Sequence, residues 1–115
     1  MFTLGETPYA GMVELPEEAQ AQGAPSHWMG YIYVPDREAA VARALELGAR
    51  KYHEMEVPEV GRFAIMADPQ GATMALYTPE NEPAPETDAE PGQVSWHELA
   101  TDDWQAAWEF YSTLF

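Results

Sequence analysis

The stretch from His27 to Pro79 decides the fold of this chain, and its most telling part reads GRFAIMADPQGATMALY, residues 61–77. Residues 61–67 alternate in side-chain character with the two-residue period of a β-strand. The tetrapeptide DPQG follows, with proline and glycine at the second and fourth positions of a type I turn. Residues 72–77 are therefore predicted to form the antiparallel partner strand.

A strand, a helix and a further strand precede this hairpin. Residues 27–34, HWMGYIYV, are rich in aromatic and β-branched side chains, which predicts a strand that ends at Pro35. Asp36 suits the cap of a helix over residues 37–47, where apolar side chains recur at helical spacing, and a glycine follows as its stop. Residues 51–57 alternate and end at Pro58, which predicts an edge strand.

The order strand, helix and three strands carries a family resemblance. With VPDREAAVARALELG at residues 34–48 and the run GRFAxxxDPxG from Gly61, it resembles one module of the vicinal oxygen chelate superfamily. That group includes glyoxalase I, the bleomycin-resistance proteins and the extradiol dioxygenases. The resemblance covers about half of the chain and implies an α+β fold, in which paired βαβββ modules form a curved mixed sheet with helices on the outside.

The two ends of the chain look like parts of a second module. Residues 1–16 hold two candidate strands, 2–4 and 9–15, which suit the hairpin that ends a module, and residues 17–26 suit a connecting loop. Residues 80–92 contain three prolines and five acidic residues, which predicts an extended linker. Residues 93–115 are expected to form a strand at 94–99 and a helix from Trp104, capped by Asp102 or Asp103.

We therefore expect residues 1–79 to form the vicinal oxygen chelate-like region, with a complete module at 27–79. One module would be split between the N-terminal hairpin and the C-terminal strand and helix of residues 93–115. That tail would pack back within its own chain, as in a circular permutant, or swap onto the partner in a homodimer. The alternative is that the chain is a fragment of a longer, four-module protein.

Charge and composition exclude several functions. Twenty acidic residues against five basic ones give a net charge of −15, which disfavours nucleic acid and anionic membranes as partners. No cysteine is present, so the chain has neither disulfides nor a thiol nucleophile. There is no long apolar run and no signal-like N-terminus, so we expect a cytoplasmic protein. Catalytic-triad, P-loop and dinucleotide-binding patterns are absent from the sequence.

The family resemblance implies where a metal would be held. Metal-dependent members use His, Gln or Glu from the first strand of each module and Glu from its last strand. By position these places fall on Met29, Trp96, Ala75 and Met12 in this sequence. None of these side chains binds a hard divalent cation. We therefore expect no metal and no cofactor, with a mostly apolar cavity in place of the metal site.

A displaced site is the alternative. His27 stands two residues from Met29, and Glu98 stands two residues from Trp96, so each shares a strand face with a ligand position. His27 and Glu98 are thus candidates for an atypical metal site or for an acid and base pair. Otherwise His27 would be a polar side chain at the mouth of the cavity.

The aromatic residues allow two interpretations. Most are expected to pack in the core or in an interface, and several would line a soft pocket together with methionines. They are Trp28, Tyr31, Tyr33, Trp96, Trp104 and Trp108, with Met12, Met29, Met66 and Met74. Arg62 could neutralise an anionic ligand, or it could form a surface ion pair with a nearby glutamate.

The sequence thus favours a metal-free small-molecule binding protein of the glyoxalase or bleomycin-resistance type, with a small apolar or aromatic ligand. The alternatives are a metal-dependent lyase, isomerase or dioxygenase with an atypical site, and a structural or assembly module. Catalysis is left open. The candidate ligand-binding residues are Met12, His27, Met29, Tyr31, Arg62, Ala75, Trp96 and Glu98.

Overall fold

The structure is a computed structural model that describes residues 2–5, 7–81, 91–94 and 96–115. The chain divides into two compact units. The first, called here the N-terminal unit, comprises residues 1–28 and 85–99, and the second, called the sheet unit, comprises residues 29–84 and 100–115. Each unit is described by itself.

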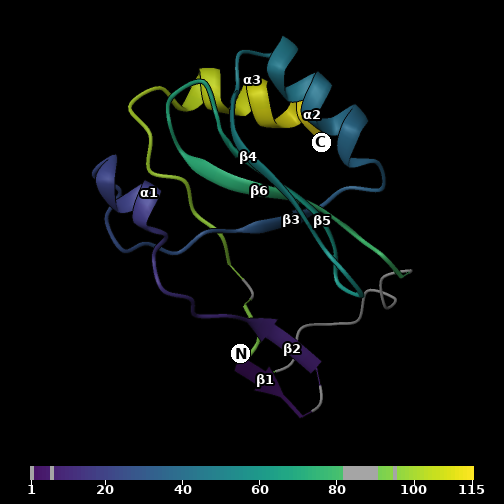
Figure 1. The fold of residues 1–115 in the computed structure, drawn as a ribbon. Coiled ribbons are helices and arrows are strands. Elements are labelled where there is room, and N and C mark those ends of the chain that lie inside the picture. The colour runs from purple at the N-terminus through teal and green to yellow at the C-terminus, as the bar shows by residue number, and fades with distance from the viewer. Residues whose placement is uncertain (1, 6, 82–90, 95) are drawn as a thin grey trace. The chain divides into compact units, whose positions relative to one another are not determined.

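A four-stranded mixed sheet forms the centre of the sheet unit (Figure 1). Its strands are β3 (Tyr31–Tyr33), β4 (Arg50–Val57), β5 (Gly61–Ala67) and β6 (Thr73–Pro79), in the spatial order β3-β6-β5-β4. The strand β3 runs parallel to β6, whereas β6, β5 and β4 are antiparallel neighbours. The predicted strand–helix–three-strand module is therefore confirmed.

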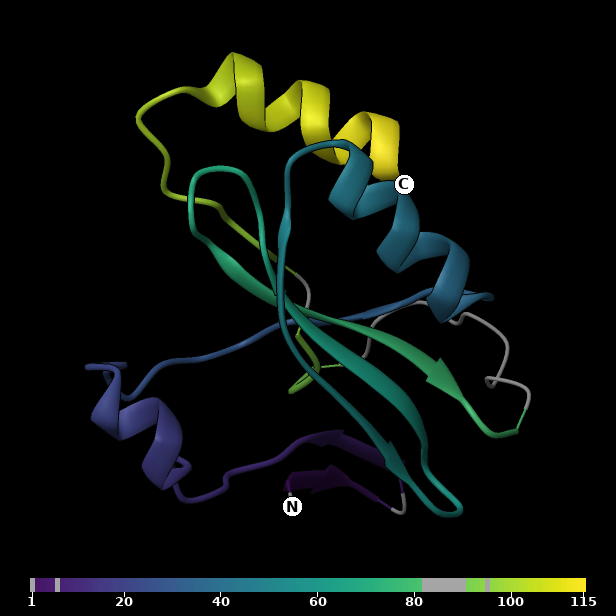
Figure 2. The same cartoon turned by 45° about the horizontal axis from the view of Figure 1, so that its top comes forward.

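Helices α2 (Arg37–Glu46) and α3 (Trp104–Leu114) lie next to each other on one side of this sheet (Figure 2). Both begin at the predicted kind of cap: the Asp36 carboxylate accepts a hydrogen bond from the Ala39 N–H, and the Asp103 carboxylate accepts one from the Ala106 N–H, each at 3.0 Å. The C-terminal helix thus packs within its own chain in this structure. A swap onto a partner stays a prediction.

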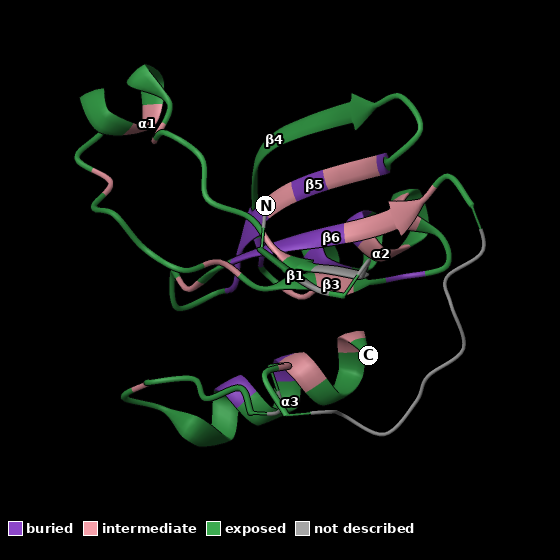
Figure 3. Ribbon diagram, turned by 90° about the horizontal axis from the view of Figure 1, so that it is seen from below, coloured by how far each residue is buried: buried purple, intermediate pink, exposed green. Residues whose placement is uncertain are grey.

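The core lies between the sheet and these two helices. On the middle strands every second side chain points toward the helices, as strand alternation requires, and Ala64, Met66 and Leu76 are fully buried there. Val41 and Ala44 of α2 and Phe110 of α3 complete the cluster from the helix side. Figure 3 shows the consequence: β5 and β6 carry buried stretches, whereas the edge strand β4 is exposed along its whole length.

The predicted turn between β5 and β6 also anchors the C-terminal helix. The Gly71 N–H donates to the Asp68 carbonyl at 3.0 Å, which closes the turn, and the buried Asp68 Oδ1 accepts from the N–H groups of Gln70 and Ala72. The second oxygen, Oδ2, accepts a hydrogen bond from the Tyr111 hydroxyl of α3 at 2.9 Å. Burial, together with this bond to the Asp68 carboxylate, raises the pKa of Tyr111 well above its usual range.

The N-terminal unit contains an antiparallel hairpin of β1 (Phe2–Leu4) and β2 (Thr7–Ala10), followed by the short helix α1 (Glu17–Ala21). The hairpin was predicted, but its second strand was placed at 9–15, which is wrong, because it begins at Thr7 and ends at Ala10. Residues 17–21 were predicted as loop and are helical. Among the described residues, no helix has the length and apolar character needed to cross a bilayer.

Two further expectations are corrected by the strand pairing. The strand expected over 27–34 is limited to Tyr31–Tyr33, because among the described residues β3 pairs with β6 alone, and this pairing begins at Tyr31 opposite Ala75. The strand expected over 94–99 is absent from the described residues of that segment. An alternating pattern supplies a face to bury, but a strand also needs a hydrogen-bonded neighbour. The linker prediction for 80–92 falls largely on residues 82–90, outside the described residues.

Candidate functional site

The face of the sheet that carries no helix is the candidate site. Ala64 and Met66 on β5, and Met74 and Leu76 on β6, point toward α2 and α3. Because side chains alternate along a strand, the residues next to them in sequence point to the opposite side of the sheet. They include Phe63 on β5 and Tyr77 on β6. The same alternation puts Tyr31 and Tyr33 there, because Ile32 and Val34 pack into the helix-side core.

Strand register gathers these side chains into two neighbouring rows. In one row Tyr33, Tyr77, Phe63 and Met55 stand opposite one another on β3, β6, β5 and β4. In the other, Tyr31, Ala75, Ile65 and His53 do so in the same order. We call these eight residues the aromatic face.

Ring contacts hold the aromatic face together. The rings of Phe63 and Tyr77 stack with centroids 4.7 Å apart and planes at 12°, and Tyr31 meets Phe63 edge-on at 5.8 Å. The Tyr77 hydroxyl donates to the Val60 carbonyl at 3.1 Å, which fixes that ring. Tyr31 and Tyr33 are nonetheless 59% and 50% exposed. The face is therefore preorganised at its centre and accessible along β3.

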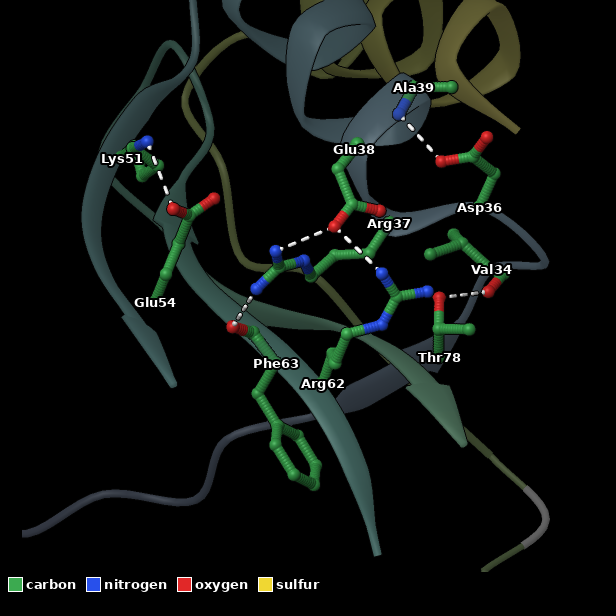
Figure 4. A network of polar contacts seen from close by, with 10 residues as sticks. All are labelled: Val34, Asp36, Arg37, Glu38, Ala39, Lys51, Glu54, Arg62, Phe63 and Thr78. Atoms are coloured by element: carbon green, nitrogen blue, oxygen red, sulfur yellow. Dashed lines mark hydrogen bonds and ion pairs between the residues drawn. The ribbon is translucent and has the colours of Figure 1, made fainter. Parts of the chain in front are cut away.

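On the helix side, the end of β5 near Gly61 carries charged side chains, next to the apolar core. Arg62 lies between Phe63 and Gly61 on β5, so its side chain points toward α2, where Glu38 accepts hydrogen bonds from both Arg62 and Arg37 at 2.8 Å (Figure 4). Arg37 also donates to the Phe63 carbonyl at 3.3 Å. Hydrogen bonding from Arg37, with the positive charges of both arginines, lowers the pKa of Glu38. Of the two readings of Arg62, the ion pair with a glutamate is confirmed.

The remaining candidates divide between the units. Met29, Tyr31 and Ala75 belong to the sheet unit, and the structure brings them together: Ala75 pairs with Tyr31, its N–H donates to the Gly30 carbonyl at 2.9 Å, and the half-buried Met29 directly precedes that glycine. The other four, Met12, His27, Trp96 and Glu98, belong to the N-terminal unit.

Within the N-terminal unit, His27 and Glu98 bond to other groups. The His27 Nδ1 donates to the Pro25 carbonyl at 2.7 Å, and Glu98 accepts a hydrogen bond from the Trp96 indole at 3.5 Å. All of these side chains are exposed, as is Met12 at 79%. An acid and base pair formed by His27 and Glu98 therefore has no geometric support in this unit.

The described residues do not fit the metal that the resemblance implies. Nowhere in the described ranges do three His, Cys, Asp or Glu side chains gather in a group that could hold an ion. In the sheet unit the ligand positions are taken by Met29 and the buried Ala75, and the sole imidazole of the two rows of the aromatic face, His53, has Ile65 rather than another donor opposite it. A hard divalent cation needs several oxygen or nitrogen ligands at about 2 Å.

A hollow at the β4–β5 hairpin end of the sheet is too small to be the main site. It is lined by polar and apolar residues, namely Glu56, Val57, Gly61, Arg62, Thr78 and Glu80, and has a volume of about 90 Å³. Sites for drug-sized ligands typically enclose about 300–1,000 Å³. The aromatic face is the better candidate.

Several expectations about the aromatic and methionine residues were wrong. Met66 and Met74 are buried under the helices and line no open surface. All four tryptophans are between 68% and 82% exposed, so a place in the core is wrong for them, whereas packing in an interface stays a prediction. Conversely, Phe63, Ile65, Tyr77 and Met55 were missed as site residues. Alternation in residues 61–67 was the signal for Phe63 and Ile65, but it could not say which face the helices cover.

Comparison with known proteins identifies the family. The sequence model of the glyoxalase-like domain matches residues 3–77, which cover the N-terminal hairpin from Thr3 onward and the strand–helix–three-strand module as far as Tyr77 in β6. The chain belongs to the glyoxalase-like domain family. This assignment agrees with the vicinal oxygen chelate resemblance and with the observed α+β sheet.

Two relatives illustrate how far the likeness extends. A protein of Mycobacterium tuberculosis named "Putative glyoxylase CFP32" is 37% identical over 76 residues, which cover 65% of this chain and 28% of the relative. The anthracycline biosynthesis protein DnrV of Streptomyces peucetius is 36% identical over 90 residues, covering 77% of this chain and 33% of the relative. The chain thus spans about a third of the length of these curated relatives.

Proposed function

We propose that this glyoxalase-like chain binds flat, apolar small molecules on its aromatic face, without a metal ion. The observation that carries the proposal is the Tyr31–Phe63–Tyr77 ring cluster, which is ordered by ring contacts and backbone register and yet borders half-exposed tyrosines. A rigid aromatic surface of this kind stacks against planar ligands at little conformational cost.

The chemistry of the ligand follows from the shape of the face. Two adjacent rows of side chains on a four-stranded sheet span several ring widths, because neighbouring strands lie about 4.8 Å apart. A molecule of two or more fused rings would cover more of this surface than a single ring. One relative is named for anthracycline biosynthesis, and anthracyclines are flat, fused-ring compounds. That name supports the same shape class for the ligand of this chain.

The test uses a neutral three-ring probe, 9-anthracenecarboxamide. If it binds the folded chain, its addition should raise the midpoint of thermal unfolding in a concentration-dependent way. Phe63→Leu keeps an apolar side chain but removes the central ring, and it should weaken the affinity about two- to tenfold. Trp108→Leu is the matched control, because it removes an exposed ring from α3, which packs on the side of the sheet opposite the aromatic face.

Two results would count against the proposal. If the probe does not stabilise the wild type at all, the binding function is refuted. If Phe63→Leu and Trp108→Leu lose the same amount of affinity for the probe, binding does not take place on the aromatic face. Metal analysis of the purified chain is the second arm. One tightly held zinc, iron, manganese or nickel ion per chain would favour the metal-dependent lyase, isomerase or dioxygenase instead.

A further inference from the structure

We propose that the aromatic face selects planar aromatic molecules that carry a positive charge and rejects anionic ones. This inference rests on the proposed function and adds the charge class of the ligand. Its basis is the distribution of charged side chains over the two sides of the sheet.

The first observation is that the cations of this chain are engaged elsewhere. The sequence has five Lys and Arg residues, and four of them form ion pairs with glutamates: Arg37 and Arg62 with Glu38, Arg43 with Glu46, and Lys51 with Glu54. The fifth, Arg50, lies outside the two rows: it stands opposite Ala67, one row beyond His53 on the same side of the sheet, and its guanidinium is beside the turn at Gly71. An anionic ligand stacked on the Phe63 and Tyr77 rings would therefore be desolvated with no Lys or Arg in either of the two rows to pair with it.

The second observation concerns what the face does offer. Seven of the eight residues in its two rows have no ionisable group that is charged near neutral pH, and the eighth is His53. Aromatic rings carry negative potential on their faces and attract ammonium-type groups within about 6 Å. The rings of Tyr31, Tyr33, Phe63 and Tyr77 stand on three adjacent strands, so a cation attached to a stacked ligand would meet at least one of them.

The third observation is the field of the whole chain. A net charge of −15 on 115 residues draws cations toward the protein and repels anions before any contact forms. This long-range part is screened by salt, with a Debye length of about 10 Å at 0.1 M, whereas the contact with the rings is not. The two contributions can therefore be separated by ionic strength.

The experiment compares three probes that share one ring system: 9-anthracenylmethylammonium, 9-anthracenecarboxamide and 9-anthracenecarboxylate. Dissociation constants are measured by fluorescence titration at pH 8, above the range in which histidine ordinarily titrates, in low and in 0.5 M salt. The cation should bind about two- to fivefold more tightly than the neutral amide even in high salt, as expected for a partly exposed cation–π contact. In low salt its advantage should grow, and the carboxylate should bind most weakly.

A charge placed on the face should reverse this order. Met55 is 38% exposed and stands opposite Phe63, so Met55→Lys puts an ammonium group at the end of the central row. Ala42→Lys, at an exposed position of α2, changes the net charge by the same single unit on the helix side. Met55→Gln controls for loss of the methionine. Only Met55→Lys should bring the carboxylate above the ammonium probe in 0.5 M salt.

The outcomes separate this inference from the proposed function. If the amide binds and the carboxylate binds as tightly as the ammonium probe in both salt conditions, charge selection is refuted while the binding function stands. Should Met55→Lys and Ala42→Lys act alike, the selection does not arise at the aromatic face and the inference fails. If none of the three probes binds, the proposed function itself is refuted and the inference falls with it.

Discussion

The hydrogen bond between Tyr111 and Asp68 gives the sharpest test of how the C-terminal helix is held. The Tyr111 hydroxyl of α3 donates at 2.9 Å to Asp68, whose side chain is only 1% exposed and lies in the β5–β6 turn. Tyr111→Phe removes this hydroxyl and keeps the ring, which packs against Phe110 and Phe115. The change therefore isolates one bond.

The size of the effect follows from the burial of the carboxylate. Asp68 Oδ1 keeps its two backbone donors, Gln70 and Ala72, but Oδ2 loses its partner. A hydrogen bond to a charged group contributes about 1.5–3 kcal/mol, and a buried acceptor left without a donor costs a similar amount. We expect Tyr111→Phe to lower the free energy of unfolding by about 1.5–3 kcal/mol, which corresponds to roughly 5–15 °C in the unfolding midpoint of a chain this size.

Urea unfolding followed by circular dichroism measures this loss, and pH supplies a second readout. Because the pKa of Tyr111 is raised in the folded state, the folded chain holds the phenolic proton more tightly than the unfolded chain. The resulting stabilisation is complete below about pH 10, the ordinary pKa of tyrosine, and is lost as pH rises above it. The stability difference between the wild type and the Y111F variant should accordingly shrink above pH 10.

Tyr33→Phe is the matched control, because that hydroxyl is on a half-exposed side chain with no hydrogen bond shown in the described structure. It should change stability by less than about 0.5 kcal/mol. A loss below about 0.5 kcal/mol in Tyr111→Phe, or a difference from wild type that does not vary with pH, would refute the role assigned to this bond.

Three further predictions concern the sheet unit. Gly61→Ala should lower the free energy of unfolding by about 2–4 kcal/mol, because a Cβ there would lie 2.4 Å from the Thr78 carbonyl oxygen at a φ of +147°. Gly30→Ala, where a Cβ would meet open space, should lower it by less than about 1 kcal/mol. Equal midpoints of thermal unfolding in the two variants would contradict this. Asp103→Ala should remove the α3 cap and lower the free energy of unfolding, measured with urea, by about 1 kcal/mol. No measurable change would mean that the cap is dispensable. Deleting residues 100–115 uncovers the core and should lower the unfolding midpoint and expose dye-binding apolar surface; a truncated chain of unchanged stability would show that α3 is not part of this core.

Local sequence determined the elements whose signals are local. The strand over 61–67, the turn at Asp68–Gly71 and the aspartate caps of both long helices were all predicted, because alternation, turn chemistry and capping depend on residues only a few positions apart. The family resemblance could be recognised from the sequence for the same reason. It rested on a run of closely spaced residues within one module.

Tertiary structure decided what depends on distant partners. Residues 94–99 have the composition of a strand, yet the described ones form none, since a strand needs a hydrogen-bonded neighbour that composition does not supply. Arg62 and Phe63 are adjacent in sequence, but only the packing of α2 and α3 on one side of β5 makes the first an ion-pair partner and the second the centre of the aromatic face. Alternation defines two faces of a strand, and the helices determine which of them stays open.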